Sequence, residues 1–376
     1  MLLLENGPGG KPAHFARPRR MIRADAAHEV EPALAAIDIE RAGGAWLAGY
    51  ASYELGYALE PKLAPLNVAP RGEPLIHFGV FDGPQDAAAI LAQAEEEAKG
   101  AALSRPAALW SQSDHARGVR AIQEYIAAGD VYQVNLTMQM ASRVTGTPLG
   151  IYGALRRRQT VAHGAFVALP DAPVVLSRSP ELFFACDGAG RIETRPMKGT
   201  APRATNPAQD AALRMDLQNS AKNRAENLMI VDLLRNDISR IARMGSVRVP
   251  ELFAVESYAT VHQMVSHVAG ELRSDIAPSD IFRALFPCGS ITGAPKIRAM
   301  QIIHELEAGP RGVYCGAIGW IGPDGSAAFN VAIRTLTLRG DHATFGVGGG
   351  IVIDSTAEGE WEEALWKARF ADLTPA

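Results

Sequence analysis

The alternation of apolar and polar residues along the chain predicts more strands than helices. Alternating segments bounded by Gly, Pro and Asp are typical of strands. The clearest are "EPLIHFGVFDG" (73–83), "HGAFVALP" (163–170) and "APVVLSRSPELFFACDG" (172–188), the last two of which we expect to pair. The same reasoning predicts strands near 247–257 and 260–269, and three consecutive strands over 312–352.

Helical periodicity is strongest over 220–245, where Met229, Ile230, Leu233 and Leu234 form the apolar face and Gly245 is the expected end. Another helix is expected to begin near Ser113 or Asp114, to end at Gly129, and to lead into a strand from Val131. Shorter helices are predicted near 278–286, 294–306 and 358–370. Because strands often follow one another directly, the pattern indicates an α+β fold with antiparallel sheets.

The clearest change in composition lies at residues 86–109, which we interpret as an exposed Ala/Glu helix followed by a Pro-containing linker. It divides the sequence into an N-terminal part, 1–110, and a longer part, 111–376. Within the first part, "GAWLAGYASYELGYALEP" (44–61) predicts a strand followed by a turn or short helix.

Composition narrows the class of protein. The chain is 47% hydrophobic and 21% charged, which suits a folded core, and its net charge of −4 gives no reason to expect a nucleic-acid partner. Three widely spaced cysteines fit neither a disulfide framework nor a zinc site. No apolar stretch reaches the roughly 20 residues of a membrane span, and the start does not resemble a signal peptide. We therefore expect a soluble cytoplasmic protein with no membrane partner.

Two glycine-rich segments do not match known nucleotide motifs. In "GVGGGI" (346–351) the third glycine of a dinucleotide fingerprint would fall on Ile351. In "GSITGAPK" (289–296) the glycines and lysine are wrongly spaced for a phosphate loop. No cysteine lies in a G-x-C-x-G context, so a glutaminase of that type is not expected within this sequence.

Carboxylates on two predicted helices are candidate metal ligands. Glu226 shares a helix face with Met229, Ile230 and Leu233, where it either pairs with Lys222 or binds a cation. Glu360, Glu363 and Lys367 line one edge of the last helix. They either form a solvated face, with a Glu363–Lys367 pair contributing a few tenths of a kcal/mol, or meet Glu226 across a cleft. Three carboxylates without His or Cys would suit Mg²⁺.

Two further features suggest an anionic substrate. "FNVAIRT" places Arg334 in a predicted strand among apolar neighbours, where a substrate carboxylate would be a natural partner. The glycines of "GVGGG" (346–350) would let backbone N–H groups approach an anion, although a bulge or turn would also explain them.

Taken together, these segments resemble the chorismate-utilising enzymes, which include anthranilate synthase component I, aminodeoxychorismate synthase component I, isochorismate synthase and salicylate synthase. The resemblance covers roughly 115–370 and rests on motifs in family order: "GDVYQVNL", "SPELF", "KGTAPR", "AENLMIVDLLRND", "VHQMVS", "CGSITGAPK", "GVYCGAIGW", "AIRT", "GVGGGIVIDS" and "EWEEALWKA". It implies an anthranilate synthase component I-like fold, with two large antiparallel sheets in a sandwich, helices outside, and the N-terminal part packed on it.

The resemblance also implies residue roles. Mg²⁺ would be bound by Glu226 and Glu363, with Glu360 nearby and partly through water. The chorismate carboxylates would contact Tyr314, Arg334, Lys367 and the backbone of Gly348 and Gly350. Thr292 and His262 would lie near the ring or its leaving oxygen, and Glu181 of "SPELF" would be the general acid that protonates the departing 4-hydroxyl.

Two positions distinguish members of the family. The water-adding enzymes have a lysine base where this sequence has Gln133, and anthranilate synthases usually have alanine where it has Lys198. The resemblance therefore implies that chorismate is aminated with ammonia to 4-amino-4-deoxychorismate, the precursor of 4-aminobenzoate and folate, with Lys198 as nucleophile. A separate glutamine amidotransferase subunit would supply the ammonia. The alternatives are an anthranilate synthase component I and a non-catalytic chorismate-binding subunit.

Overall fold

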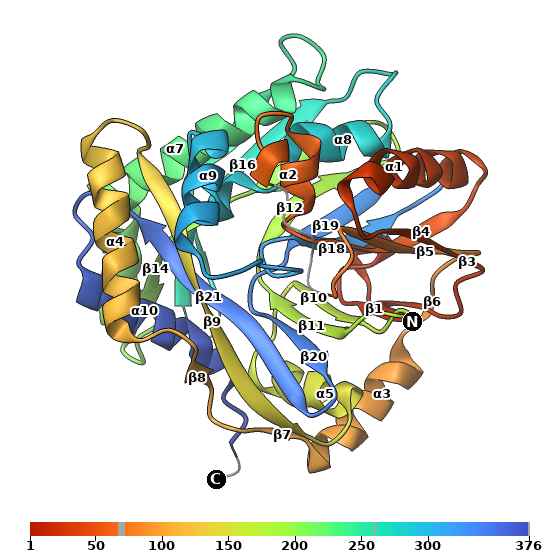
Figure 1. Cartoon of the computed structure of the whole chain (residues 1–376), viewed down its shortest axis with the longest axis horizontal. Helices are drawn as coiled ribbons and strands as arrows, with labels where there is room; N and C mark the ends of the chain where they lie inside the picture. Colours follow the sequence, from red (N-terminus) through yellow and green to blue (C-terminus); the bar gives the residue numbers. More distant parts are fainter. Residues whose placement is uncertain (67–71, 259–260, 375–376) are drawn as a thin grey trace.

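A computed structural model describes residues 1–66, 72–258 and 261–374 (Figure 1). Its first sheet has eleven strands, and the main path is β17 (Gly293–Ala294), β9 (Gln133–Thr145), β21 (His342–Ile351), β20 (Thr335–Arg339), β11 (Val174–Ser179), β10 (His163–Val167), β1 (Leu2–Leu4), β2 (Ala13–Phe15) and β6 (Gln85–Asp86). Two short strands, β7 (Ala102–Leu103) and β8 (Ala107–Ala108), also pair with β9.

The second sheet has ten strands, in the order β14 (Met197–Pro202), β16 (Val261–Glu271), β13 (Arg191–Arg195), β12 (Leu182–Cys186), β19 (Ala327–Val331), β18 (Ala317–Ile321), β4 (Trp46–Ala51), β5 (Ile76–Phe81) and β3 (Arg20–Ala24), with β15 (Arg248–Ser257) beside β16. The pairings within both sheets are antiparallel, for example β21 with β9 and β18 with β19. The predicted α+β fold with two large antiparallel sheets is thus confirmed.

Helices cover the outer faces of the sheets. Against the first sheet, α3 (Ala88–Glu97), α5 (Pro148–Arg158) and α10 (Ala357–Ala368) bury one apolar cluster. Against the second, a larger cluster includes α1 (Ala27–Ala42), α7 (Ala221–Ser239), α8 (Pro278–Leu285) and α9 (Lys296–Leu306). In Figure 1, α1, α7 and α8 lie on the opposite side of the molecule from α3 and α5. The remaining α-helices of the described residues are α2 (Leu55–Leu59), α4 (Gln112–Ala127) and α6 (Pro207–Asn219).

The N-terminal and C-terminal parts share both sheets. In the first sheet β1 pairs with β10, and in the second β4 pairs with β18. A third apolar cluster, between the sheets, combines Leu4 and Tyr50 with Val167 and Trp320. Strands from both sides of residue 110 are thus hydrogen-bonded together within each sheet. The division of the chain into two parts at this residue stays a prediction. No helix of the described residues is long and apolar enough to cross a membrane.

The chain passes between the sheets at several points, two of which are adjacent. It leaves the first sheet after β11, and Pro180 and Glu181 lead into β12 of the second. It returns after β19 through residues 332–334. The two passages contact each other, because the Val331 N–H donates to the Glu181 carbonyl at 3.1 Å and the Arg178 N–H donates to the Arg334 carbonyl at 2.9 Å. Pro180 explains the first passage, since it has no N–H to continue a ladder.

Three details of the sequence interpretation were wrong. The long helix α7 ends at Ser239, before Gly245, because Ile241 and Ala242 turn into the core and Ala242 forms a bridge with Leu272. Residues 312–352 contain four strands, β18 to β21, and not three. The third error concerns Arg334, which lies between β19 and β20 and not within a strand.

Close packing of α3 and α5 generates a stability prediction. A Cβ added at Gly153 would lie 2.1 Å from the carbonyl oxygen of Ala94, whereas one at Gly100 would meet nothing within 4 Å. We expect Gly153→Ala to lower the free energy of unfolding by about 1–3 kcal/mol, because the helices must separate. Gly100→Ala is the control and should change it by less than about 1 kcal/mol. Urea denaturation measures both, and equal effects would contradict the packing.

Candidate active site

Lys198 lies on β14, the edge strand of the second sheet, where α7 presses on the backbone. The register of β14 against β16 shifts between Met197 and Thr200. The intervening Gly199 has a φ of +89°, and a Cβ there would lie 2.9 Å from Cγ of Asn223 in α7. Burial lowers the pKa of Lys198, and the negative charges of Glu226, Glu181 and Glu363 oppose this shift. The amine is therefore partly desolvated and lies within the electrostatic range of these three carboxylates.

Glu181 is buried at the first passage between the sheets. Its Oε1 accepts a hydrogen bond of 2.8 Å from the Ser290 hydroxyl. Burial raises the pKa of Glu181 to about 7, against the opposing effects of the Ser290 hydrogen bond and the Lys198 charge. A carboxyl group with this pKa holds a proton near neutral pH and can donate it, as a general acid must.

Arg334 lies at the second passage and adopts a φ of 50°, which is uncommon for a residue other than glycine. Its guanidinium is half-buried, and within the described residues it forms no ion pair. Burial lowers the pKa of Arg334, and the charge of Glu181 opposes this effect. A strained backbone holding a partly desolvated, unpaired cation is suited to bind a carboxylate.

Helix α10 presents Glu360, Glu363 and Lys367 to the glycines of β21. Lys367 Nζ lies 2.7 Å from Glu363 Oε1 and donates to the Gly348 carbonyl at 2.7 Å. A Cβ on Gly349 would lie 2.8 Å from Glu360 Oε2, so this glycine permits the close approach. The Glu363–Lys367 pair is therefore formed, but beside the glycine strand and not on a purely solvated face.

The two α10 carboxylates have different electrostatic environments. Burial raises the pKa of Glu360, with the Ser355 hydrogen bond of 2.6 Å acting against it and Glu363 reinforcing it. Burial acts in the same direction on Glu363, but Lys367 and Lys198 together hold the pKa of Glu363 below its usual value. An added cation would favour the charged form of both carboxylates.

Glu226 is half-buried on α7, and within the described ranges it has neither a hydrogen bond nor an ion pair. The alternative of a Lys222–Glu226 pair is therefore not formed in this structure. Its charge instead acts on Lys198, as does the charge of Glu363. Lys198 thus lies within the electrostatic range of carboxylates from both α7 and α10.

The carboxylates fit Mg²⁺ by donor type but are not gathered into one cluster. Within the described residues no group of three or more His, Cys, Asp or Glu side chains lies close enough to hold a metal ion. Oxygen donors with no thiol or imidazole among them are the ligands that Mg²⁺ prefers, and this ion commonly takes one or two protein carboxylates with water and substrate.

Three other predicted substrate contacts occupy tightly packed positions. The buried Thr292 hydroxyl donates to the carbonyls of Cys288 and Gly289 at 3.3 and 3.2 Å. The buried Tyr314 ring covers Gly346, where a Cβ would lie 2.4 Å from Cδ1 of the ring. Gly350 lies beneath the buried Gln133 side chain in the same way.

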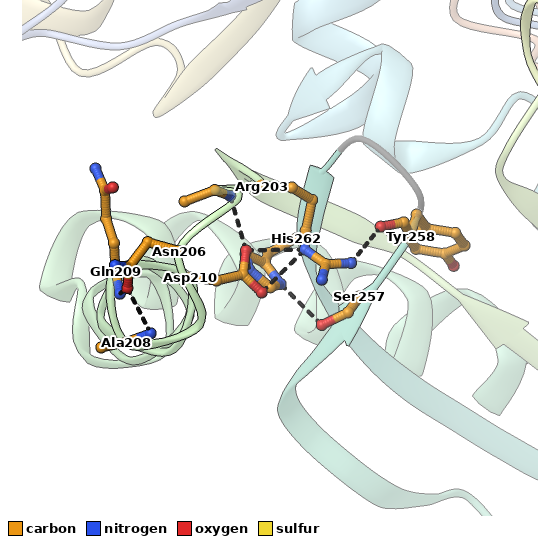
Figure 2. Close-up of polar contacts among 9 residues, drawn as sticks. Arg203, Asn206, Ala208, Gln209, Asp210, Ser257, Tyr258 and His262 are labelled. Carbon is orange, nitrogen blue, oxygen red and sulfur yellow. Dashed lines mark hydrogen bonds and ion pairs between the residues drawn. The ribbon is translucent and has the colours of Figure 1, made fainter.

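His262 lies in a separate polar network (Figure 2). Its Nδ1 lies 2.8 Å from the Ser257 hydroxyl and its Nε2 lies 3.0 Å from Oδ1 of Asp210, which also accepts from Arg203. Both ring nitrogens therefore have protein partners, on β15 and α6. In the described part of the chain, no hydrogen bond or ion pair joins His262 to Lys198 or Glu181, so its catalytic role stays a prediction.

Sequence reasoning missed Ser290, whose hydroxyl binds Glu181. The signal was its place in "CGSITGAPK", two residues before Thr292. The structure also contains a small cavity between the sheets, lined by Leu4, His163, Trp320 and other residues, that includes none of the predicted site residues.

Comparison with known proteins identifies the family. The profile of the chorismate binding enzymes matches residues 2–372. This chain belongs to the chorismate binding enzyme family. It is 46% identical over 248 residues to aminodeoxychorismate synthase component 1 of Escherichia coli, a match that covers 66% of this chain and 54% of that protein. The Bacillus subtilis protein of the same name is 42% identical over 262 residues, covering 70% and 55%. These matches span little more than half the length of the relatives.

A solved structure agrees with the fold of this family member. Anthranilate synthase component I from Streptococcus pneumoniae superimposes with a TM-score of 0.81 at 27% identity, covering 95% of this chain and 91% of that one. An isochorismate synthase from Bacillus anthracis, at 18% identity and a TM-score of 0.78, shows the same fold, with 98% and 94% covered.

The raised pKa of Glu181 predicts a pH-dependent stability. Because the folded state holds this proton more tightly, its stabilising effect is present at acid pH and is lost as the pH rises through about 7. Gln cannot ionise, so the variant Glu181→Gln does not lose stability in this way. We therefore expect its free energy of unfolding, minus that of the unsubstituted protein, to increase between pH 5 and 8 by on the order of 1–3 kcal/mol. Urea denaturation at several pH values measures this. The exposed Glu362→Gln is the control, and the same trend in both would contradict the assignment.

Proposed function

We propose that this chain catalyses the amination of chorismate with ammonia to 4-amino-4-deoxychorismate, the precursor of 4-aminobenzoate and folate. The observation that carries the proposal is the environment of Lys198, a desolvated amine with lowered pKa in the electrostatic range of Glu181, Glu226 and Glu363. Relatives named aminodeoxychorismate synthase, 41–49% identical to this chain, support the same reaction.

Binding of chorismate would use the groups that surround this amine. Arg334 is the bidentate partner proposed for one carboxylate, since its half-buried guanidinium has no ion pair among the described residues. Tyr314, Lys367 and the backbone of Gly348 and Gly350 provide further carboxylate contacts, and Thr292 lies near the ring. His262 has no step in this proposal, because Ser257 and Asp210 occupy both of its nitrogens.

Amination would proceed by two displacements. The free-amine form of Lys198, which burial favours, attacks C2 of chorismate and forms a C–N bond. The ring double bonds shift, and the 4-hydroxyl departs as water with the proton of Glu181. Ammonia then adds at C4, the double bonds shift back, and the bond from C2 to Lys198 breaks. The Glu181 carboxylate takes up the proton that the new amine releases, which restores the acid.

Mg²⁺ is proposed as the cofactor, held by Glu226 and Glu363 with Glu360 nearby. When bound, the ion would supply positive charge that neutralises a chorismate carboxylate. The chain's own contribution is to present carboxylates from α7 and α10 within the electrostatic range of Lys198.

The proposed ammonia source is a separate glutamine amidotransferase subunit. The name "component 1" of the E. coli and B. subtilis relatives implies a partner component for those proteins. Ammonium salts alone should support the reaction of this chain in its place.

Anthranilate synthase component I is the second candidate, favoured by the S. pneumoniae structure. Lys198 and the higher identity to aminodeoxychorismate synthases favour the first. A non-catalytic chorismate-binding subunit is the third candidate. The products from chorismate, Mg²⁺ and ammonium distinguish all three, because anthranilate fluoresces, aminodeoxychorismate needs a lyase to form 4-aminobenzoate, and a non-catalytic subunit consumes no chorismate.

Substitution of Lys198 tests the nucleophile directly. We expect Lys198→Ala to lower kcat with ammonium by at least about 100-fold, because the first displacement is lost. The unsubstituted enzyme, denatured during turnover, should carry a chorismate-derived mass on the peptide that contains Lys198. The absence of this adduct together with an unchanged rate in Lys198→Ala would exclude the covalent role.

Substitution of the carboxylates tests the metal. We expect Glu226→Gln and Glu363→Gln to raise the Mg²⁺ concentration needed for half-maximal activity by about 10-fold or more, because each removes one charged oxygen donor. Titration of Mg²⁺ into EDTA-treated enzyme measures this concentration. Asp232→Asn, an exposed carboxylate on the same helix as Glu226, is the control and should leave it unchanged.

A further inference from the structure

Glu307 and Arg311 form a buried ion pair just beyond the end of α9. Their side chains are 5% and 1% exposed. The pair is bidentate, because Arg311 donates from Nε to Glu307 Oε2 at 2.9 Å and from Nη2 to Oε1 at 2.6 Å. Two charges so far from water must be matched by further polar groups if the fold is to retain them. The identity of those groups indicates what the pair does.

The further polar groups belong to two other segments of backbone. Arg311 Nη1 donates to the Ile291 carbonyl at 2.9 Å, and Nη2 donates to the Asn135 carbonyl at 2.8 Å. Glu307 Oε1 accepts from the Thr137 N–H at 2.9 Å. One ion pair thus connects the end of α9, strand β9 and the segment before β17.

These segments carry several of the proposed substrate contacts. On β9, Asn135 is paired with Gly350 and Thr137 with Gly348 of β21. The Asn135 N–H also donates to the Thr292 carbonyl at 2.8 Å. Thr292 is therefore fixed on both sides, by this bond and by the bond from Arg311 to the preceding carbonyl.

The backbone that leads from Arg311 to Tyr314 is fixed by two carboxylates. Glu54 accepts from the N–H groups of Arg311 and Gly312 at 2.7 and 3.0 Å, and Glu73 accepts from Val313 at 2.8 Å. The Arg311 guanidinium also lies 4.6 Å from the centre of the Tyr53 ring. Position and orientation of the guanidinium are thus determined from several directions.

We propose that Glu307 and Arg311 are a positioning pair that sets the placement of Thr292, Tyr314 and the Gly348–Gly350 backbone around chorismate. This inference rests on the proposed function, in which those groups contact the substrate and neither member of the pair does. A planar guanidinium suits the task because its fork directs several N–H groups in fixed directions at once, which an ammonium group cannot do.

The test compares Arg311→Lys with a matched control. Arg178→Lys alters another fully buried arginine, whose side chain bonds to Glu5, to the Tyr152 hydroxyl and to the Gln159 carbonyl but to none of the proposed substrate contacts. Its backbone N–H, which donates to the Arg334 carbonyl, is unchanged by this substitution. Both variants should be less stable. We expect Arg311→Lys alone to raise the KM for chorismate, by about 10- to 100-fold, because small misplacements of binding groups have effects of this size. It should also lose the increase in Tm that chorismate with Mg²⁺ gives the unsubstituted protein.

Each outcome is decisive. If Arg311→Lys keeps the normal KM and the normal chorismate-induced Tm increase, the pair is merely structural and the proposal is wrong. If Arg311→Lys does not fold, Glu307→Gln takes its place, because the amide keeps an acceptor but removes the charge. If the unsubstituted protein gains Tm with chorismate but makes no aminated product, the proposed function fails while the positioning role is still decided by the Tm increase.

Discussion

Partial desolvation of charge at the passages between the two sheets is the constraint on which the site depends. Glu181 and Arg334 lie on two of those passages. Lys198 lies on the edge strand β14, where the negative charge of Glu181 raises its pKa against the effect of burial. Removal from water destabilises the charged form of each of these groups, and the attraction between their opposite charges partly offsets that cost. Burial thereby raises the pKa of Glu181 to about 7 and lowers the pKa of Lys198, which favours a protonated acid and a free amine in the same site.

Close packing of backbone brings the second half of the site to these charges. Gly349 lets α10 approach β21 until Glu360 lies over the strand, and Gly199 lets α7 approach β14. A Cβ at Gly199 would meet Cβ and Cγ of Asn223 on α7, and one at Gly349 would meet the carboxylate of Glu360 on α10. A side chain at either position would therefore displace groups on the helices that carry the carboxylates acting on Lys198. These glycines therefore affect the electrostatics of the site by allowing a short distance between helix and strand, and not only by allowing unusual backbone angles.

Much of the structure follows from local sequence patterns. The apolar periodicity of α4, the helix–strand succession and the antiparallel α+β class were all predicted from the sequence. The cap of α4 is Ser111, a little before the predicted Ser113 or Asp114. The predictions were wrong where long-range contacts determine the local structure. Arg334 was wrongly predicted to lie within a strand, because apolar neighbours suit a buried loop as well as a strand. The early end of α7 depends on the Ala242–Leu272 bridge, which no local pattern encodes.

By itself, the sequence determined the fold class and the family, and with the family a list of site residues, because their order and spacing are properties of the chain. Only the tertiary structure decided how they are arranged. It formed the Glu363–Lys367 pair and not a Lys222–Glu226 pair, gave both nitrogens of His262 protein partners, and brought Ser290 to Glu181. Burial and distance across two sheets set these contacts and the resulting pKa values, and neither quantity is defined before the chain folds.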